Sequence, residues 1–150
     1  MKALVVFDSV AGNTEKIAEA VAAGIAADTK AVRIGSSEAT KLEKVTLLVV
    51  GSPTFGGRPT EAMQKYVDSV APASRNLAVA AFDTRLRTKL VKVFGYSADK
   101  IAARFKEMGS KVEEKPEGFI VNGRTGPLAD GELERAALWG KDLRRKYSGA

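Results

Sequence analysis

The sequence of 150 residues contains no cysteine and no histidine. Disulfides and iron–sulfur clusters held by cysteine are therefore excluded, as are the common zinc sites and a histidine general base. Chemistry performed by this chain has to use carboxylates, hydroxyls, lysine, arginine or a borrowed cofactor. The remaining composition, with 45% hydrophobic and 28% charged residues, is typical of a globular protein.

Long apolar runs are also missing. The first run, Ala3 to Phe7, is interrupted at once by Asp8, whereas a secretory signal continues for longer, and no stretch approaches the length of a membrane span. We therefore expect a cytoplasmic protein that does not bind membranes. No internal repeat, low-complexity tract or linker divides the chain, so residues 1–150 are expected to form a single domain.

Acidic residues are less frequent than basic ones. The chain has 18 aspartate and glutamate residues against 24 lysine and arginine residues, which gives a net charge of +6. A basic balance favours acidic partners but does not identify a fold. The basic residues are spread over several predicted helices, aromatic residues make up only 7%, and the usual nucleic-acid recognition motifs are missing. We expect no nucleic-acid partner.

Strand and helix patterns alternate along the chain. Short apolar runs without helical periodicity predict strands at 3–7, 45–50 and 77–82, with weaker strands at 31–34 and 118–121. Amphipathic patterns predict helices at 13–27, 60–70 and 97–108, and a last helix from about Asp130 to Tyr147. Residues 36–44 have only a poor helical pattern. The alternation predicts an α/β domain with parallel strands, right-handed crossovers and helices on both faces of one sheet.

In such a sheet a ligand binds beyond the carboxyl ends of the strands. The loop after the first strand, residues 8–14, is made of small residues with one glycine and leads directly into a helix, which suits it to bind a phosphate. It lacks the three spaced glycines of a dinucleotide site and the Gly-Lys-Ser/Thr of a Walker loop. From the residues alone, an ordinary turn capped by Asn13 is an equally good interpretation.

The loop after the third strand, residues 51–60, is rich in glycine and proline but has Phe55 at its centre. An exposed aromatic ring on a loop can stack on a planar ligand, although Phe55 can instead fold back onto the following helix. Gly56 and Gly57 permit positive φ angles. The fourth strand is followed by a further aromatic and polar group at residues 82–85.

These loops together resemble the FMN-binding loops of flavodoxins. Residues 9–14 resemble the phosphate loop, residues 51–57 the second flavin loop, and segments 82–85 and 126–136 are similar to those of short flavodoxin-like proteins. The resemblance spans nearly the whole chain. It implies a three-layer α/β sandwich with a five-stranded parallel sheet in the order 2-1-3-4-5 and noncovalently bound FMN at its carboxyl edge.

The resemblance also implies which residues bind the cofactor, and it implies neither a catalytic residue nor a metal. The cofactor-binding residues would be Ser9, Val10, Ala11, Gly12, Asn13, Thr14, Pro53, Thr54, Phe55, Gly56, Gly57, Phe82, Asp83, Thr84 and Arg85.

Two residues depart from the flavodoxin pattern. Ala11 stands where many flavodoxins have a hydroxyl residue, so we expect weaker phosphate binding. The tyrosine that usually follows the aspartate of the third loop is missing after Asp83, and the next aromatics are Phe94 and Tyr96. Tyr96 can either return to the flavin or anchor the chain against the sheet, and the sequence favours neither.

The largest departure is the charge, because typical flavodoxins are strongly acidic. Arg85, Arg87, Lys89 and Lys92 follow one another without an intervening acid, in the segment that would leave the flavin edge. One interpretation is a solvated basic face. The other is that these cations favour the anionic reduced form of the flavin, raise its potential and steer acidic redox partners.

The resemblance favours a monomeric electron carrier that shuttles electrons between redox protein partners. An NAD(P)H-dependent quinone-type oxidoreductase on the same fold is an alternative, but such relatives are usually longer and oligomeric, and no insertion here supplies a substrate pocket. A flavin-free interaction module is a further alternative that only the positive charge supports. A phosphorylation receiver domain needs clustered acidic residues after the first strand, where only Asp8 fits.

Overall fold

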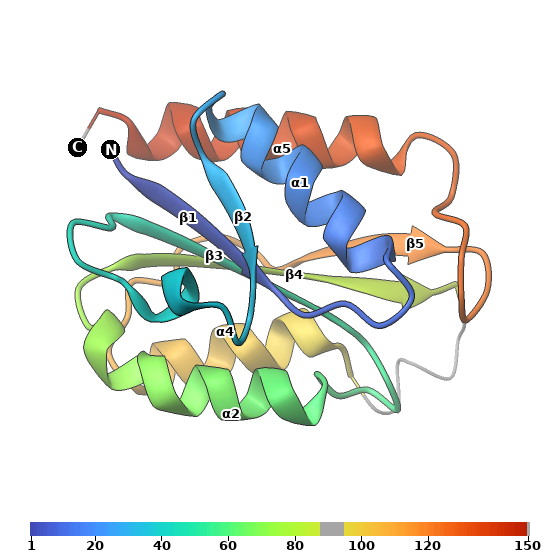
Figure 1. The fold of residues 1–150 in the computed structure, drawn as a ribbon, viewed down its shortest axis with the longest axis horizontal. Coiled ribbons are helices and arrows are strands. Elements are labelled where there is room, and N and C mark those ends of the chain that lie inside the picture. The colour runs from blue at the N-terminus through green and yellow to red at the C-terminus, as the bar shows by residue number, and fades with distance from the viewer. Residues whose placement is uncertain (88–94, 150) are drawn as a thin grey trace.

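The computed structural model describes residues 1–87 and 95–149. A five-stranded parallel sheet in the order β2-β1-β3-β4-β5 forms its centre, which confirms the predicted topology (Figure 1). The strands are β1 (Ala3–Phe7), β2 (Lys30–Arg33), β3 (Leu47–Pro53), β4 (Ala78–Leu86) and β5 (Glu117–Val121). The helices are α1 (Asn13–Ile25), α2 (Glu61–Val70), α4 (Ser97–Glu107) and α5 (Glu132–Tyr147), with short 3-10 helices at Ser37–Thr40 and Ala71–Ser74.

Helices α1 and α5 cover one face of the sheet, and α2 and α4 cover the other (Figure 1). Alternation along each strand supplies both cores, because successive side chains point to opposite faces. In β1, Val5 faces α1 and α5, while Leu4 and Val6 face α2 and α4. The sheet therefore separates two apolar cores. No helix in the described part of the chain is long and apolar enough to span a bilayer.

Helices α1 and α5 approach each other closely through two glycines. A Cβ atom at Gly24 would overlap the carbonyl oxygen of Ala137, and one at Gly140 would overlap the carbonyl oxygen of Val21. Glycine is therefore required at both positions by the distance between the helix backbones. This contact holds the first helix, and the loop that precedes it, at a defined place over the sheet.

Strands β3 and β4 extend further than the apolar pattern predicts. β4 continues to Leu86, and its last five residues pair with β5 from Phe82↔Glu117 to Leu86↔Val121. Asp83, Thr84 and Arg85 consequently belong to a strand and not to a loop. The polarity of these residues hid the extension, because pairing with β5 stabilises it rather than any local apolar pattern.

Helix α5 begins at Glu132 and not at a capping Asp130, since Gly131 adopts a left-handed conformation (φ 83°) as the residue before the helix. The Glu132 carboxylate accepts a hydrogen bond of 2.7 Å from the backbone N–H of Ile120. Ile120 lies on β5, at the edge of the sheet. The Ile120 N–H points away from β4, where no neighbouring strand in the described part of the chain offers a carbonyl acceptor, and the Glu132 carboxylate takes the place of that acceptor.

Candidate functional site

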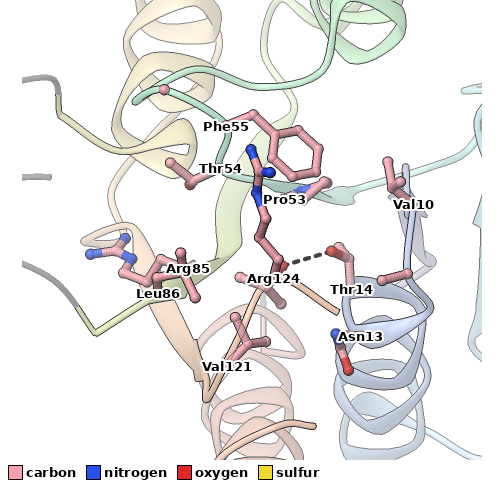
Figure 2. Close-up of a pocket in the computed structure, with 13 residues that line it drawn as sticks. Val10, Asn13, Thr14, Pro53, Thr54, Phe55, Arg85, Leu86, Val121 and Arg124 are labelled. Carbon is pink, nitrogen blue, oxygen red and sulfur yellow. Dashed lines mark hydrogen bonds between the residues drawn. The ribbon is translucent and has the colours of Figure 1, made fainter. Parts of the chain in front are cut away.

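A cleft opens at the carboxyl ends of the strands, where α1 begins and where β3, β4 and β5 end (Figure 2). Loops that are far apart in the sequence meet there, as expected for an open parallel sheet. Its lining consists of Val10, Ala11, Asn13, Thr14, Pro53, Thr54, Phe55, Gly56, Thr84, Arg85, Leu86, Val121 and Arg124.

The loop between β1 and α1 is closed by the side chain of Ser9. Its Oγ accepts hydrogen bonds from the N–H groups of Gly12 (3.1 Å) and Glu15 (3.3 Å). Gly12 precedes the helix with a φ of 91°, so a glycine and not Asn13 occupies the capping position. The expected cap at Asn13 is therefore wrong.

The same loop presents backbone donors that are not used by the protein. Within the described residues, no acceptor is recorded for the N–H groups of Val10, Ala11, Asn13 and Thr14. These donors surround the N-terminus of α1, where the helix dipole adds positive partial charge. The side chains of Asn13 and Thr14 are buried beside them. The arrangement is suited to bind an anion.

Arg33 of β2 holds this loop in position. Its guanidinium donates to the carbonyl oxygen of Ser9 (2.8 Å) and to the carboxylate of Glu15 (3.2 Å). It also lies 3.8 Å from the carboxylate of Asp8, which accepts a hydrogen bond of 2.5 Å from the hydroxyl of Thr60. The loop is thereby tied to both the neighbouring strand and the start of α2.

The second loop projects Phe55 into the cleft. The backbones of Phe55 and Arg58 exchange hydrogen bonds of 2.9 and 3.0 Å, and Gly56 and Gly57 between them have φ angles of 56° and 78°. Two consecutive positive φ angles make this a tight hairpin of type I′, which explains the paired glycines. Phe55 remains 44% exposed and faces the cleft instead of folding back onto α2 (Figure 2).

A network of hydrogen bonds fixes the floor of the cleft. Thr54 donates its N–H to the carbonyl oxygen of Thr84 (2.9 Å), and its hydroxyl accepts the N–H of Ser97 (3.2 Å). The hydroxyl of Ser97 in turn donates to the carbonyl oxygen of Pro53 (2.9 Å). The hairpin that carries Phe55 is therefore anchored to β4 and to the first residue of α4.

Arg85 lines the cleft, but its guanidinium is engaged elsewhere. It donates two hydrogen bonds of 2.7 Å to the buried carboxylate of Asp83 and lies 3.4 Å from the ring centroid of Tyr96. Asp83 also accepts the N–H of Ala98 (2.9 Å). Burial raises the pKa of Asp83, while the Arg85 guanidinium and the Ala98 N–H act in the opposite direction. Figure 2 shows the guanidinium of Arg85 pointing away from Phe55.

The side chains of two of the predicted cofactor-binding residues are buried away from the cleft. Phe82 is fully buried in the core under α1 and α5, with its ring centroid 6.1 Å from that of Phe119 and 6.0 Å from that of Trp139. Asp83 is fully buried on the opposite face, against α4. Both positions follow from the extension of β4, because strand residues alternate between faces. We therefore correct the expectation that their side chains contact a cofactor.

The other predicted residues gather at this edge of the sheet. Ser9, Gly12 and Gly57 shape the loops without lining the cleft themselves, and the remaining ones line it. Tyr96 stacks on Arg85 of β4 and does not line the cleft. Phe94, Lys89 and Lys92 lie outside the described residues.

Sequence reasoning missed Leu86, Val121 and Arg124, which complete the lining. Leu86 was missed because β4 is longer than predicted. Val121 and Arg124 belong to the end of β5 and the turn after it. The end of the fifth strand belongs to the same ligand-binding edge as the ends of the first, third and fourth, because all strands of the sheet are parallel. No group of acidic side chains that could hold a metal ion occurs within the described ranges.

Comparisons with known proteins agree with this architecture. A family model described as flavodoxin matches residues 5–139. A flavodoxin from the domain Archaea is 26% identical with a TM-score of 0.81, covering 97% of this chain and 98% of that chain. Oxidised flavodoxin 2 from Bacillus cereus is 17% identical with a TM-score of 0.80, covering 98% and 100%. A WrbA-like protein from Agrobacterium tumefaciens is 20% identical with a TM-score of 0.70, covering 97% and 98%. Among curated proteins, none matches the sequence.

Proposed function

The chain belongs to the flavodoxin family, and we propose that it shuttles electrons between redox proteins with FMN held in the cleft at the carboxyl ends of the strands. Members of this family bind FMN and transfer electrons to redox partners. The observation that carries the site assignment is the juxtaposition of unpaired backbone donors and an exposed aromatic ring in one cleft. The bound flavin supplies the redox chemistry, and the chain supplies its binding and its environment.

The donors around the start of α1 fit the phosphate end of FMN. Four amides without recorded acceptors among the described residues lie there, at a helix N-terminus, and the side chains of Asn13 and Thr14 are buried in the same turn. Ala11 contributes only its backbone N–H, so the phosphate would receive one side-chain hydrogen bond fewer than a hydroxyl residue at that position allows.

The opposite side of the cleft fits a planar ring system. Phe55 projects from a hairpin whose base is anchored to β4 and α4, so little conformational entropy would be lost on stacking against a ligand. Pro53, Thr54 and Gly56 flank Phe55 in the lining. We infer that these residues bind the isoalloxazine and that Phe55 stacks on it.

The rim of the cleft supports brief docking of protein partners. Val10 is 70% exposed, Phe55 44% and Leu86 39%, so three apolar side chains surround the site at which electrons would leave. Arg58, Arg87 and Arg124 are exposed on the surrounding loops. Apolar contacts with positive charge nearby favour acidic partners and fast, salt-sensitive association.

An electron carrier is favoured over an NAD(P)H-dependent quinone oxidoreductase. The lining of the cleft belongs entirely to the strand ends and the loops that follow them, and the WrbA-like neighbour shares only the fold. We include in this proposal the expectations that residues 1–150 act as one domain, as a monomer, in the cytoplasm, and without nucleic acid. Size-exclusion chromatography with light scattering tests the monomer.

Flavin titration tests the site. The purified protein should quench the fluorescence of added FMN with one-to-one stoichiometry and turn yellow, and it should bind riboflavin on the order of a hundredfold more weakly because the phosphate contacts are missing. Undiminished flavin fluorescence would contradict the proposal. Equal affinity for FMN and riboflavin would contradict the assignment of the α1 loop. Rapid steady-state oxidation of NAD(P)H with a quinone acceptor would favour the oxidoreductase.

A further inference from the structure

Two cationic side chains line the cleft, Arg85 and Arg124, and they differ in their partners. Arg85 is neutralised by the buried carboxylate of Asp83 and stacks on Tyr96. Arg124 is exposed, and no ion pair or hydrogen bond of its side chain is recorded within the described residues. Its positive charge is therefore available to a ligand of the cleft, whereas most of the field of Arg85 is cancelled by Asp83.

The turn that carries Arg124 is fixed at its base. Asn122 donates its N–H to the carbonyl oxygen of Pro127 (2.9 Å), and Gly126 donates to that of Gly123 (3.0 Å). Gly126 has a φ of 99°, and a Cβ there would lie 2.8 Å from the side chain of Asn13, so the turn sits tightly against the start of α1. Arg124 thus extends from a rigid support.

The side chain of Arg124 reaches across the cleft. In Figure 2 it extends toward Phe55 and Pro53, so its guanidinium lies on the side of the hairpin loop and not beside the unpaired amides of the α1 loop. In the site proposed above, that side of the cleft takes the ring of the flavin.

We propose that Arg124 is the residue that biases the flavin of this protein toward its reduced state, by facing the ring with an uncompensated positive charge. The inference rests on the FMN site of the proposed function. Uptake of two electrons from a redox partner and one proton from solvent adds one negative charge to the ring system. A cation that faces the ring stabilises that charge and has little effect on the neutral oxidised ring.

The sequence suggests this role for the basic run of Arg85, Arg87, Lys89 and Lys92, and the structure bears on Arg85. The bidentate pairing with Asp83 removes Arg85 as a net charge near the cleft. Lys89 and Lys92 lie outside the described residues. Arg87 is exposed but does not line the cleft, so among the described residues the uncompensated cation of the lining comes from the turn after β5, which is distant in sequence from the basic run.

The test compares Arg124→Gln with Arg144→Gln. Both variants lose one positive charge, but Arg144 is exposed in the last turn of α5, at the opposite end of the sheet from the cleft. Arg124→Gln should lower the ratio of reduced-FMN to oxidised-FMN affinity about tenfold, which corresponds to about 30 mV in the two-electron midpoint potential. Arg144→Gln should change the ratio less than threefold, and Arg124→Lys should restore most of the wild-type ratio.

The readouts are the dissociation constant of oxidised FMN, from fluorescence quenching, and the midpoint potential from reductive titration against a reference dye. An Arg124→Gln potential equal to that of Arg144→Gln would overturn the inference. Loss of discrimination between FMN and riboflavin in Arg124→Gln, with an unchanged potential, would also overturn it by assigning Arg124 to the phosphate. Failure of the wild-type protein to bind FMN would overturn the proposed function itself, and the inference with it.

Discussion

The hydroxyl oxygens of Thr14 and Thr84 lie 2.8 Å apart in the protein interior and share a hydrogen bond (Figure 2). Thr14 belongs to the first turn of α1 and Thr84 to β4, 70 residues away. The bond joins the loop that presents the unpaired amides to the strand that anchors the Phe55 hairpin. The two halves of the cleft are therefore held together by a buried polar contact, before any ligand binds.

The contributions of the two hydroxyl groups to the free energy of unfolding should be coupled. Thr14→Val leaves the Thr84 hydroxyl buried without its partner and should lower the free energy of unfolding by about 1–3 kcal/mol, whereas the double variant with Thr84→Val should cost less than the sum of the single variants. Urea denaturation of the flavin-free protein measures all four proteins of the cycle. Strictly additive effects would show that the two hydroxyls do not interact.

Phe55 should matter for flavin binding and little for folding. It is 44% exposed, so Phe55→Ala should change the free energy of unfolding by less than about 0.5 kcal/mol. Loss of ring stacking should weaken FMN binding about tenfold. Leu133→Ala is a matched control, because Leu133 is 42% exposed on α5, away from the cleft. Equal FMN affinity in both variants, measured by fluorescence quenching, would rule out stacking on Phe55.

The close approach of α1 and α5 predicts a severe effect of one methyl group. Gly140→Ala places a Cβ against the carbonyl oxygen of Val21, with backbone on both sides and no flexible side chain that can yield. We expect a loss of about 3 kcal/mol in the free energy of unfolding. Gly149→Ala, at a position with open space around it, should change stability by less than about 0.5 kcal/mol. Thermal and urea unfolding compare the two, and similar midpoints would contradict the packing described here.

Glu132 should contribute to the acid sensitivity of the fold. Hydrogen bonds from Arg135 and from the N–H of Ile120 lower its pKa below the ordinary value of 4.5. A carboxylate whose pKa is lower in the folded state stabilises the protein above its unfolded pKa, and this contribution disappears as the pH falls through the folded pKa.

Glu132→Gln should consequently reduce stability at pH 7, and its stability should fall less steeply than that of the wild type when the pH is lowered below about 4.5. Urea midpoints measured from pH 7 to pH 3 give both curves. Glu134→Gln is the control, since Glu134 lies in the same turn of α5 but is exposed. Parallel curves for wild type and Glu132→Gln would show that the Glu132 contacts do not stabilise the fold.

The exposed arginines on the loops around the cleft, Arg58, Arg87 and Arg124, should govern the rate of electron transfer to charged acceptors. Oxidation of the reduced, FMN-loaded protein by ferricyanide should slow as ionic strength rises, because salt screens the attraction between an anion and the arginines around the cleft. A cationic cobalt complex should show the opposite trend. Stopped-flow measurements at several salt concentrations test both, and a ferricyanide rate that does not depend on salt would contradict steering by this surface.

The sequence alone predicted the order of the elements and two sides of the cleft. The apolar run of β1 and the periodic pattern of α1 are local signals, and they are reliable because burial of each face depends on residues within one element. The loops that bear Ser9 and Phe55 were found for the same reason, since glycines and small polar residues report turn geometry locally. The strand order followed from the resemblance to flavodoxins and not from these patterns.

The tertiary structure decided which charges face the cleft. The length of β4 depends on its pairing with β5, a contact between segments more than 30 residues apart, and that pairing sends Phe82 and Asp83 to opposite faces of the sheet. In the folded protein Arg85 pairs with Asp83, whereas the side chain of Arg124 has no recorded partner within the described residues. The sequence by itself determined that the chain is basic. Only the folded structure decided which arginine keeps an available charge in the cleft, because the pairing of charges depends on distances between side chains that no local pattern encodes.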